Sequence, residues 1–403
     1  MEFDMFLQEM LGITKEFAVV QVEKMTSPEK ITRIYLKYQA TDCVVDGKYY
    51  PIYDYAPERE WQHLGWFEYK CYLIAKLPRY KDKEGKIKTY KPNFSPPGRS
   101  YTNFFRSATI QLLQKIKVQN SVAEIMRTTP YIVRSIMEDA VEQGMINRGE
   151  VIHFNNISID EKAYTRGHHY ATIIMDSDKE HILDLQEGRR EKDLKTLLYL
   201  LSGQETLPDL NIVNMDMWKP YMNVIKEVAP QATIVHDNFH VVKKLTEAID
   251  NTRKKEVKNC DLLKFQKFNV LKNSENRSDQ QKKLFTELAA TNINTTKAWQ
   301  VRENYKVLWS YINLNKETAK DLIKTWIDNS KTYAIEHVNK ALNTIEAHIE
   351  GIAAALMTRT SSGLHENTNG RIQSIVARAR GFANFERFRI NALFYYGNLQ
   401  YNH

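Results

Sequence analysis

The sequence predicts an α/β protein in which a sheet of mixed strand direction is preceded by a small N-terminal unit and interrupted by helices. Three observations support this fold class. Short β-branched runs at 157–160, 170–175 and 181–185 are separated by turns, which indicates three consecutive antiparallel strands. Helical and strand patterns then alternate from 191 to 236. From about 241 to 356 the pattern is helical and polar, which indicates a helical insertion.

The composition is that of a basic globular chain. Its 403 residues correspond to about two or three domains. Lys and Arg number 57 against 49 Asp and Glu, for a formal net charge of +8. No apolar run is long enough to span a membrane, and the N-terminus lacks the pattern of a signal peptide, so we expect a cytoplasmic, nucleoid-associated protein. Cys43, Cys71 and Cys260 lie too far apart to indicate a disulfide framework or a cysteine metal ribbon.

The N-terminal unit, residues 1–100, is rich in aromatic residues and ends in a lysine-rich stretch. Between Lys76 and Arg99 there are eight basic and two acidic residues. Its lysines can neutralise phosphates, and Tyr80, Tyr90 and Phe94 can stack on bases. A solvated hairpin with a lysine-rich edge explains the pattern equally well. The lysines expected to contact DNA are Lys81, Lys83, Lys86, Lys88 and Lys91.

Residues 101–150 predict a helix-turn-helix. Helical spacing runs from Asn103 through Phe104 and Phe105 to Ile116, and a short helix at 121–127 starts with a capping box formed by Ser121 or Asn120 with Glu124. The segment Thr128-Thr129-Pro130 interrupts the pattern, which resumes from 131 to 143. A plain helical hairpin is an equally good interpretation. On a recognition helix the exposed residues would be Tyr131, Arg134 and Ser135, with Arg134 reading or flanking bases.

The strand order from 151 to 240 is that of an RNase H-like core, because most other α/β folds alternate strand and helix from the start. Asp160 ends the first strand, and Asp216 ends the fourth, just before a helix that has Pro220 in its first turn. These two strands are neighbours in such a sheet, so both carboxylates reach one crevice. At about 4 Å they would repel by roughly 4 kcal/mol unless a cation lay between them. Mg²⁺ suits an all-oxygen site, and two such ions can support phosphoryl transfer.

A third carboxylate is expected from a helix after the insertion, within 357–403. On a helical wheel Glu366 lies on a polar side with Asn369, Gly370, Gln373 and Arg380, where DNA can approach. A glutamate near a helix start is also explained by the helix dipole alone. The opposite, core-facing stripe consists of Leu364, Thr368, Ile372, Ile375 and Ala379.

Taken in order, these motifs resemble the DDE transposases of the insertion-sequence family ISL-three. No single motif is specific, but the ordered set is, and it covers nearly the whole chain. The matching pieces are Ile159-Asp160-Glu161, Gln186-Glu187-Gly188-Arg189, Asn214-Met215-Asp216-Met217-Trp218-Lys219-Pro220-Tyr221, Pro230-Gln231-Ala232, Val235-His236-Asp237-Asn238-Phe239-His240-Val241, Asn367-x-Asn369-x-Arg371-Ile372 and Arg378-Ala379-Arg380-Gly381-Phe382.

The resemblance implies a catalytic, metal-binding triad of Asp160, Asp216 and Glu366 that uses Mg²⁺, with Mn²⁺ as a substitute. Asp237 and His240 match an auxiliary D-x-x-H element, in which Asp237 is the reserve candidate for a metal ligand. Glu161 and Asp184 rank lower, because strand alternation would send Glu161 to the other face. Further DNA contacts are expected from Arg371, Arg378 and Arg380.

The family usually begins with a cysteine zinc ribbon, and here the sequence departs from it. Trp61-Gln62-His63-Leu64 and Leu77-Pro78-Arg79 match the surroundings of that ribbon, but the cysteine pairs are absent. We therefore expect a ribbon-like fold without zinc. Its core would be formed by the aromatic residues Tyr53, Trp61, Trp66 and Phe67.

The function expected from this sequence is DNA transposition. The chain would bind the terminal inverted repeats of an insertion sequence as a homodimer, cut at them and join the ends to target DNA. Two alternatives stay open: a structure-specific nuclease of the same fold, and a non-enzymatic regulator that uses only its helix-turn-helix. The expected organisation is a DNA-binding unit at 1–100, a helix-turn-helix at 101–150, the core at 151–240 and 357–403, and the helical insertion at 241–356.

Overall fold

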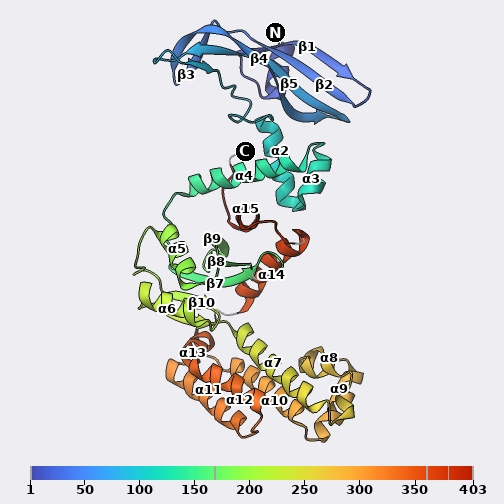
Figure 1. Ribbon diagram of the computed structural model, residues 1–403, viewed down its shortest axis with the longest axis vertical. Coiled ribbons are helices and arrows are strands. Elements are labelled where there is room, and N and C mark those ends of the chain that lie inside the picture. Colours follow the sequence, from blue (N-terminus) through green and yellow to red (C-terminus); the bar gives the residue numbers. More distant parts are fainter. Residues whose placement is uncertain (1, 168, 360–361, 380, 402–403) are drawn as a thin grey trace. The chain divides into compact units, whose positions relative to one another are not determined.

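The computed structural model describes residues 2–167, 169–359, 362–379 and 381–401. The chain divides into two compact units, of which one spans 1–148 together with 399–403 and the other spans 149–398. Both are shown in Figure 1. None of the helices in the described part of the chain is long and apolar enough to cross a membrane.

The first unit is built on a six-stranded sheet, which is larger than the small ribbon expected from the sequence. The strand order is β1-β2-β5-β4-β3, with β6 paired to β5. Strands β2 and β5 are parallel, and the other pairs are antiparallel. The elements are α1 (Glu2–Leu11), β1 (Phe17–Met25), β2 (Ile31–Tyr38), β3 (Asp42–Val45), β4 (Lys48–Trp66), β5 (Tyr69–Lys81) and β6 (Ile87–Thr89).

An aromatic core holds this sheet, but its members differ from those expected. Trp61 is buried as expected, whereas Tyr53, Trp66 and Phe67 are exposed. Phe94 packs edge-on against Trp61 at 5.3 Å between ring centroids and against Phe17 at 5.4 Å. Phe94 therefore belongs to the core. The expectation that Phe94, Tyr80 and Tyr90 stack on bases is wrong, because all three are buried.

Three helices follow the sheet: α2 (Asn103–Ile116), α3 (Gln119–Ile125) and α4 (Pro130–Arg148). Thr102 caps α2, since its side chain accepts a hydrogen bond from the Phe105 amide. The capping box expected at Ser121 is absent, because Ser121 lies inside α3, which starts at Gln119. The buried positions of α2 are Phe105, Thr109, Ile110 and Leu113, so the stripe falls one position away from the predicted Phe104, which is exposed.

The second unit contains the five strands expected from the sequence, in the order β11-β10-β7-β8-β9. Strands β7, β8 and β9 are antiparallel to one another, and β10 is parallel to both β7 and β11. Helices α5 and α6 pack on the face that includes Ile157, Ile159 and Val213. The elements are β7 (Asn156–Ala163), β8 (Tyr170–Asp176), β9 (His181–Glu187), α5 (Glu191–Ser202), β10 (Ile212–Met215), α6 (Lys219–Val228) and β11 (Thr233–His236).

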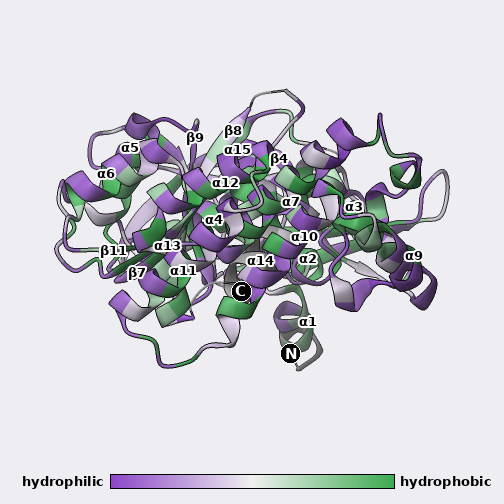
Figure 2. Ribbon diagram, turned by 90° about the horizontal axis from the view of Figure 1, so that it is seen from below, coloured by the Kyte–Doolittle hydropathy of each residue, from purple (hydrophilic) through white to green (hydrophobic). Residues whose placement is uncertain are grey.

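The regular elements from Asn238 to Thr358 are all helical. Most of them share a large apolar core that includes Trp326, and a smaller separate cluster contains Leu263, Val270, Phe285 and Leu288. Trp299 and Trp309 are partly buried and pack against the large core. Figure 2 shows polar and apolar residues interspersed along such helices. The elements are α7 (Asn238–Glu256), η1 (Asp261–Leu263), α8 (Lys267–Leu271), η2 (Ser274–Asn276), α9 (Asp279–Ala290), α10 (Asn294–Val307), η3 (Leu308–Ser310), α11 (Lys316–Lys331), α12 (Glu336–Ala347) and α13 (Ile349–Thr358).

The chain returns to the sheet through α13, α14 (Ser362–Ala379) and α15 (Phe385–Tyr396). Ala354 and Ala355 of α13 cluster with Val235 of β11. On the other edge of the sheet, Arg389 of α15 donates two hydrogen bonds to the carboxylate of Asp184 in β9, at 2.7 and 2.8 Å. On α14 Ile372 and Ile375 are buried as predicted, but Ala379 is exposed.

Candidate functional site

The register of two parallel strands brings Asp160 and Asp216 to the same end of the sheet. Met215 of β10 pairs with Ile159 of β7, so the two aspartates are the next residues of neighbouring strands. In each aspartate Oδ1 accepts a hydrogen bond from the amide of the following residue, at 2.8 Å for Asp160 and 2.6 Å for Asp216. One detail differs from the prediction: Asp160 does not end its strand, because β7 continues to Ala163.

Both aspartates line one cavity of about 180 Å³. Acidic, basic and aromatic side chains meet there, and they come from β7, the loop after β10, α6 and α7. A cavity with this mixture of groups can hold a cation and a phosphate together. The lining residues are Ile159, Asp160, Glu161, Lys162, Asp216, Trp218, Tyr221, Phe239, His240 and Lys243.

The second carboxylate oxygen of Asp216 contacts the imidazole of His240. Its Nδ1 lies 3.2 Å from Oδ2 of that carboxylate. Burial by itself raises the pKa of Asp216, but the hydrogen bond and the charge of His240 outweigh burial and lower it. Burial likewise lowers the pKa of His240, and the same contact outweighs burial and raises it. The pair therefore favours an ionised aspartate beside a protonated imidazole.

Glu161 also lines the cavity, which corrects the expectation that strand alternation would remove it. Burial raises the pKa of the Glu161 carboxyl, as do the charges of Asp160 and Asp216, while Arg189 lowers it. Nη1 of Arg189 lies 3.9 Å from Oε1 of Glu161. Residues from both faces of β7 reach the cavity, because β10 ends at Met215 and leaves that edge of β7 without a neighbour beyond Ile159.

The other acidic candidates are placed differently. Asp237 is buried and caps α7, where its Oδ1 accepts a hydrogen bond from the Phe239 amide at 2.9 Å. It is absent from the described residues that line the cavity. Asp184 is engaged by Arg389 at the edge of the sheet. Glu366 belongs to α14, but its side chain lies outside the described part of the structure.

The donor set in the cavity suits a hard cation. Oδ2 of Asp160 and Oε2 of Glu161 are buried and have no hydrogen-bond partner among the described residues. Lys162 Nζ approaches that oxygen of Asp160 only to 3.9 Å. Buried carboxylate oxygens without partners are costly, and a divalent cation would satisfy them. Within the described side chains, no group of three His, Cys, Asp or Glu residues forms a complete metal site.

The expected DNA-contacting lysines surround β6. Lys81, Lys83, Lys86, Lys88 and Lys91 are all exposed. Two of them have acidic partners: Lys86 contacts Glu84, and Lys88 contacts Asp82, each at 2.8 Å.

On α4, Tyr131 is exposed and Arg134 is half-buried, with its Nε 3.7 Å from Glu138 Oε1. Ser135 is buried, so the expectation that it is exposed is wrong. On α14, Arg378 is exposed, and the guanidinium of half-buried Arg371 lies 6.0 Å from the centre of the Tyr396 ring. Arg380 lies outside the described residues.

Sequence reasoning missed the basic and aromatic part of the cavity. Lys162 and Lys243 were not singled out, and neither were the rings of Trp218 and Phe239. Helical spacing held a signal for Lys243, because His240 and Lys243 are three residues apart and therefore share a face of α7. The rings carry no comparable signal, since an isolated aromatic residue at a helix start is usually part of a core.

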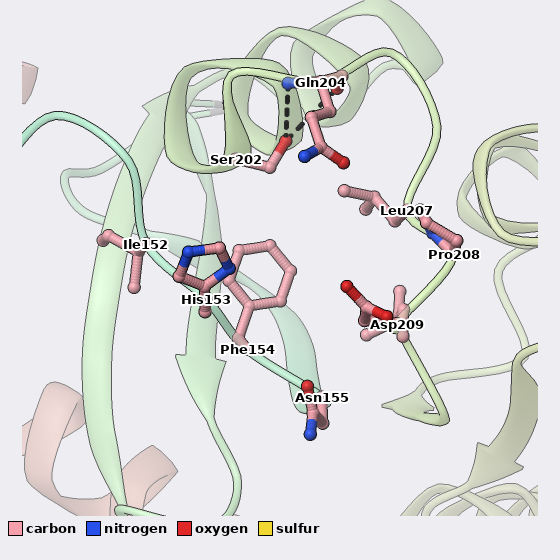
Figure 3. A pocket seen from close by; sticks show the side chains of 10 residues that line it. Ile152, His153, Phe154, Asn155, Ser202, Gln204, Leu207, Pro208 and Asp209 are labelled. Atoms are coloured by element: carbon pink, nitrogen blue, oxygen red, sulfur yellow. Dashed lines mark hydrogen bonds between the residues drawn. The ribbon is translucent and has the colours of Figure 1, made fainter.

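A second cavity lies at the opposite, amino ends of the same strands (Figure 3). It is formed by the segments that precede β7 and β10, and Ser202 Oγ accepts a hydrogen bond from the Gln204 amide at its border. His153 and Asp209, its titratable residues, are both exposed. We assign no chemistry to this cavity, because it has no convergent buried polar groups and is remote along the strands from Asp160.

A family model and two relatives that match this chain are all described as transposases. Residues 157–392 match the ISL3-type DDE domain, which is described as a transposase. The chain is 25% identical to the transposase for insertion sequence element IS1001 of Bordetella parapertussis, over 97% of this chain and 98% of that protein. It is 24% identical to the transposase for insertion sequence element IS1557 of Mycobacterium tuberculosis, over 80% of this chain and 78% of that protein.

Proposed function

Because the chain belongs to the ISL3-type DDE transposase family, and this family implies a phosphoryl-transfer enzyme with an RNase H-like core, we propose that it cuts and joins the ends of an insertion sequence. In detail, it binds the terminal inverted repeats, cleaves the DNA there and transfers the 3′-hydroxyl ends to target DNA. The observation that carries this proposal is the pair of register-matched aspartates in one cavity with unpartnered carboxylate oxygens.

In this proposal Asp160, Asp216 and Glu366 would hold Mg²⁺, or Mn²⁺ in its place. Such ions, when bound, supply positive charge that activates a water or hydroxyl and stabilises the leaving oxygen. His240 keeps Asp216 ionised and oriented through its 3.2 Å contact. Lys162 and Lys243, which line the same cavity, attract the scissile phosphate. Transposition joins two element ends, and we therefore propose a homodimer on DNA.

Conservative substitutions test the catalytic assignment. Asp160→Asn, Asp216→Asn and Glu366→Gln should each abolish cleavage of an element end while leaving end binding and thermal stability nearly unchanged, because each removes a charged ligand at almost constant volume. Asp209→Asn, an exposed aspartate at the other end of the strands, is the matched control. Near-normal cleavage by one of the three variants would remove that residue from the triad.

Strand transfer separates the proposal from the nuclease alternative. A labelled element end incubated with the full chain, Mg²⁺ and a supercoiled plasmid should become covalently joined to the plasmid. Cleavage without joining would favour a structure-specific nuclease of the same fold. Binding without cleavage in Mg²⁺ or Mn²⁺ would favour the non-enzymatic regulator.

We propose that the first unit supplies DNA recognition. Replacing exposed Lys83 and Lys91 with alanine should weaken binding to all sequences and reduce the slope of log K against log salt by about 0.9 for each phosphate that is no longer neutralised. Arg134→Ala should mainly reduce the preference for element ends, by about 1–3 kcal/mol if it contacts a base edge. If Arg134→Ala weakens binding to element ends and to random DNA equally, Arg134 contacts phosphate and not a base.

A further inference from the structure

We infer that Trp218, assisted by Phe239, is a stacking site for an unpaired nucleobase next to the scissile phosphate. This inference rests on the proposed function and deepens it, since it names how the DNA end is held at the cavity. It begins from two exposed aromatic residues beside the carboxylates. Trp218 is 41% exposed and Phe239 is 47% exposed, and both line the cavity of Asp160 and Asp216.

The exposure of Trp218 has no structural explanation at the start of α6. Trp218 is the N-cap residue of that helix, where its indole cannot cap because the ring N–H donates and the helix start needs an acceptor. An indole that caps nothing and is not buried in the core gains little stability from its position. Trp218 is also two residues after Asp216, so any group that stacks on it lies close to the carboxylates.

Arg189 connects the indole to the sheet. Its guanidinium lies 4.2 Å from the centre of the Tyr170 ring and 5.9 Å from that of Trp218. Its Nη1 is also 3.9 Å from Glu161 Oε1. These contacts restrict the freedom of the indole before any ligand arrives. A pre-ordered ring loses less entropy on binding, which favours its use as a stacking surface.

The chemistry of the cavity indicates which ligand would use these rings. Its carboxylates and lysines are unsuited to a purely apolar ligand, whereas a nucleotide offers both an aromatic face and a phosphate. A cavity of about 180 Å³ admits part of one nucleotide but not a base pair. A base that reaches it must therefore leave the duplex stack, and an exposed aromatic ring can replace the stacking that the base gives up.

Phe239 supplies the second ring. It packs edge-on against His240, the residue that contacts Asp216, with 5.5 Å between ring centroids. Phe239 lies at the start of α7 and Trp218 just before α6, so the two rings come from different elements around one cavity. Base–aromatic stacking tolerates any base, and the site would therefore hold the end without reading its sequence.

A fluorescent base tests this inference apart from catalysis. The full chain is mixed with an element-end duplex that carries 2-aminopurine next to the scissile phosphate, in Ca²⁺ so that no cleavage is required. Wild-type protein should quench the unstacked base through the indole. Trp218→Ala should leave that base bright, and Trp218→Phe should restore part of the quenching. Tyr199→Ala removes another exposed ring, from α5, and should match wild type.

Cleavage in Mg²⁺ provides the second readout. Trp218→Ala should slow cleavage of the intact end about 5- to 150-fold, the range expected when one base–aromatic stack is removed. On a substrate with an abasic site at that nucleotide, wild type and Trp218→Ala should cleave at the same rate, because there is no base to stack. Phe239→Ala should behave like Trp218→Ala with a smaller effect.

Two results would overturn the inference. Equal fluorescence of wild type and Trp218→Ala would mean that the base does not reach the indole. An equal loss of rate by Trp218→Ala on intact and abasic ends would mean that the ring only supports the fold. If wild type cleaves no element end in Mg²⁺ or Mn²⁺, the proposed function itself fails, and the inference fails with it.

Discussion

Acidification should destabilise the first unit through one buried histidine, His63. Burial lowers the pKa of His63 to about 4, from an ordinary value of about 6.5. The side chain is buried in β4, and its Nδ1 lies 2.8 Å from Oγ1 of Thr102, the cap of α2. Protonation would place a charge in this buried position. The neutral form is therefore the one that the folded unit stabilises.

The sign and size of the effect follow from the two pKa values. Between pH 6.5 and 4 the unfolded chain binds a proton at this histidine and the folded chain does not, so stability falls as the pH falls. Above pH 6.5 the neutral, buried His63 makes its full contribution to the free energy of unfolding. It is reduced by about 2.5 kcal/mol at pH 4.5, and little further loss occurs below pH 4.

Hydrogen exchange can measure this loss within the first unit of the full chain. Exchange of peptides from β4 and β5 should become faster between pH 7 and pH 4.5, after correction for the intrinsic pH dependence of exchange. His63→Asn keeps a hydrogen-bonding group for Thr102 but cannot titrate, so its stability should change less over this range. The variant His153→Asn, at an exposed histidine, is the control. The same loss in wild type and His63→Asn would refute the reasoning.

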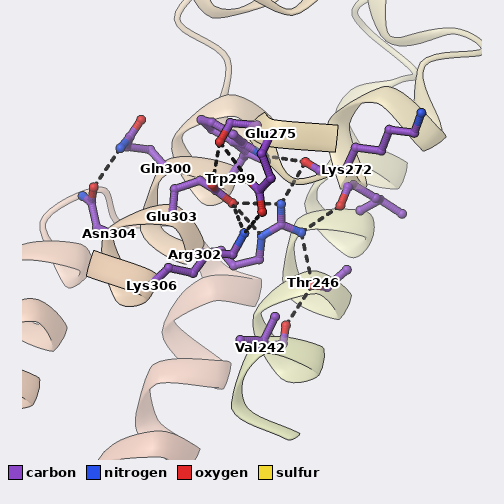
Figure 4. Close-up of polar contacts among 12 residues, drawn as sticks. Val242, Thr246, Lys272, Glu275, Trp299, Gln300, Arg302, Glu303, Asn304 and Lys306 are labelled. Atoms are coloured by element: carbon purple, nitrogen blue, oxygen red, sulfur yellow. Dashed lines mark hydrogen bonds and ion pairs between the residues drawn. The ribbon is translucent and has the colours of Figure 1, made fainter. Parts of the chain in front are cut away.

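The remaining predictions concern packing and metal content. Arg302 is fully buried and donates hydrogen bonds to the carbonyls of Leu271 and Lys272 at 2.8 and 3.0 Å (Figure 4). Arg302→Met should therefore lower the free energy of unfolding, measured in urea, by about 3 kcal/mol. An unchanged midpoint of the urea transition would contradict this. A Cβ on Gly351 would meet Cδ2 of His236 at 2.4 Å, so Gly351→Ala should lower the melting temperature, whereas Gly370→Ala, which meets nothing within 4 Å, should not. Purified protein should hold no stoichiometric zinc after chelator treatment, because a structural zinc site needs four ligands and no group of even three His, Cys, Asp or Glu side chains among the described residues could hold a metal ion. Retention of one zinc ion per chain would contradict this prediction.

The sheet around the candidate site was predictable because it depends on local patterns. Short β-branched runs and the turns between them marked each strand, and the order of strands placed Asp160 beside Asp216. The contact between His240 and Asp216 was not predictable, since it depends on how far α7 leans over the sheet. Glu161 was misplaced because the cavity lies at the edge of β7 that is unpaired beyond Ile159, where residues from both faces of the strand line it.

The first unit was harder to predict, because its core joins residues that are distant in sequence. Phe17 contacts Tyr38 and Phe94, at 5.3 and 5.4 Å between ring centroids. No local pattern distinguishes these rings from exposed ones such as Tyr53 or Phe67. A long strand with alternating exposure places half its aromatic residues in solvent, and which half depends on register. The sequence therefore indicated an aromatic core but, apart from Trp61, not its members.

Helix α7, the first helix after β11, is part of the candidate site, and the helices beyond it support it through a shared apolar core. Helix α7 presents Phe239, His240 and Lys243 to the cavity, while Val241 and Leu245 on its other face belong to the apolar core of the helical region. That core also includes Met217, the residue after Asp216. Side chains that contact the acidic cavity are thus held in place by packing among α7 and the helices beyond it. Loosening this packing should displace His240 from Asp216 even when the sheet stays intact, because a helix moves as a unit with the residues on both of its faces.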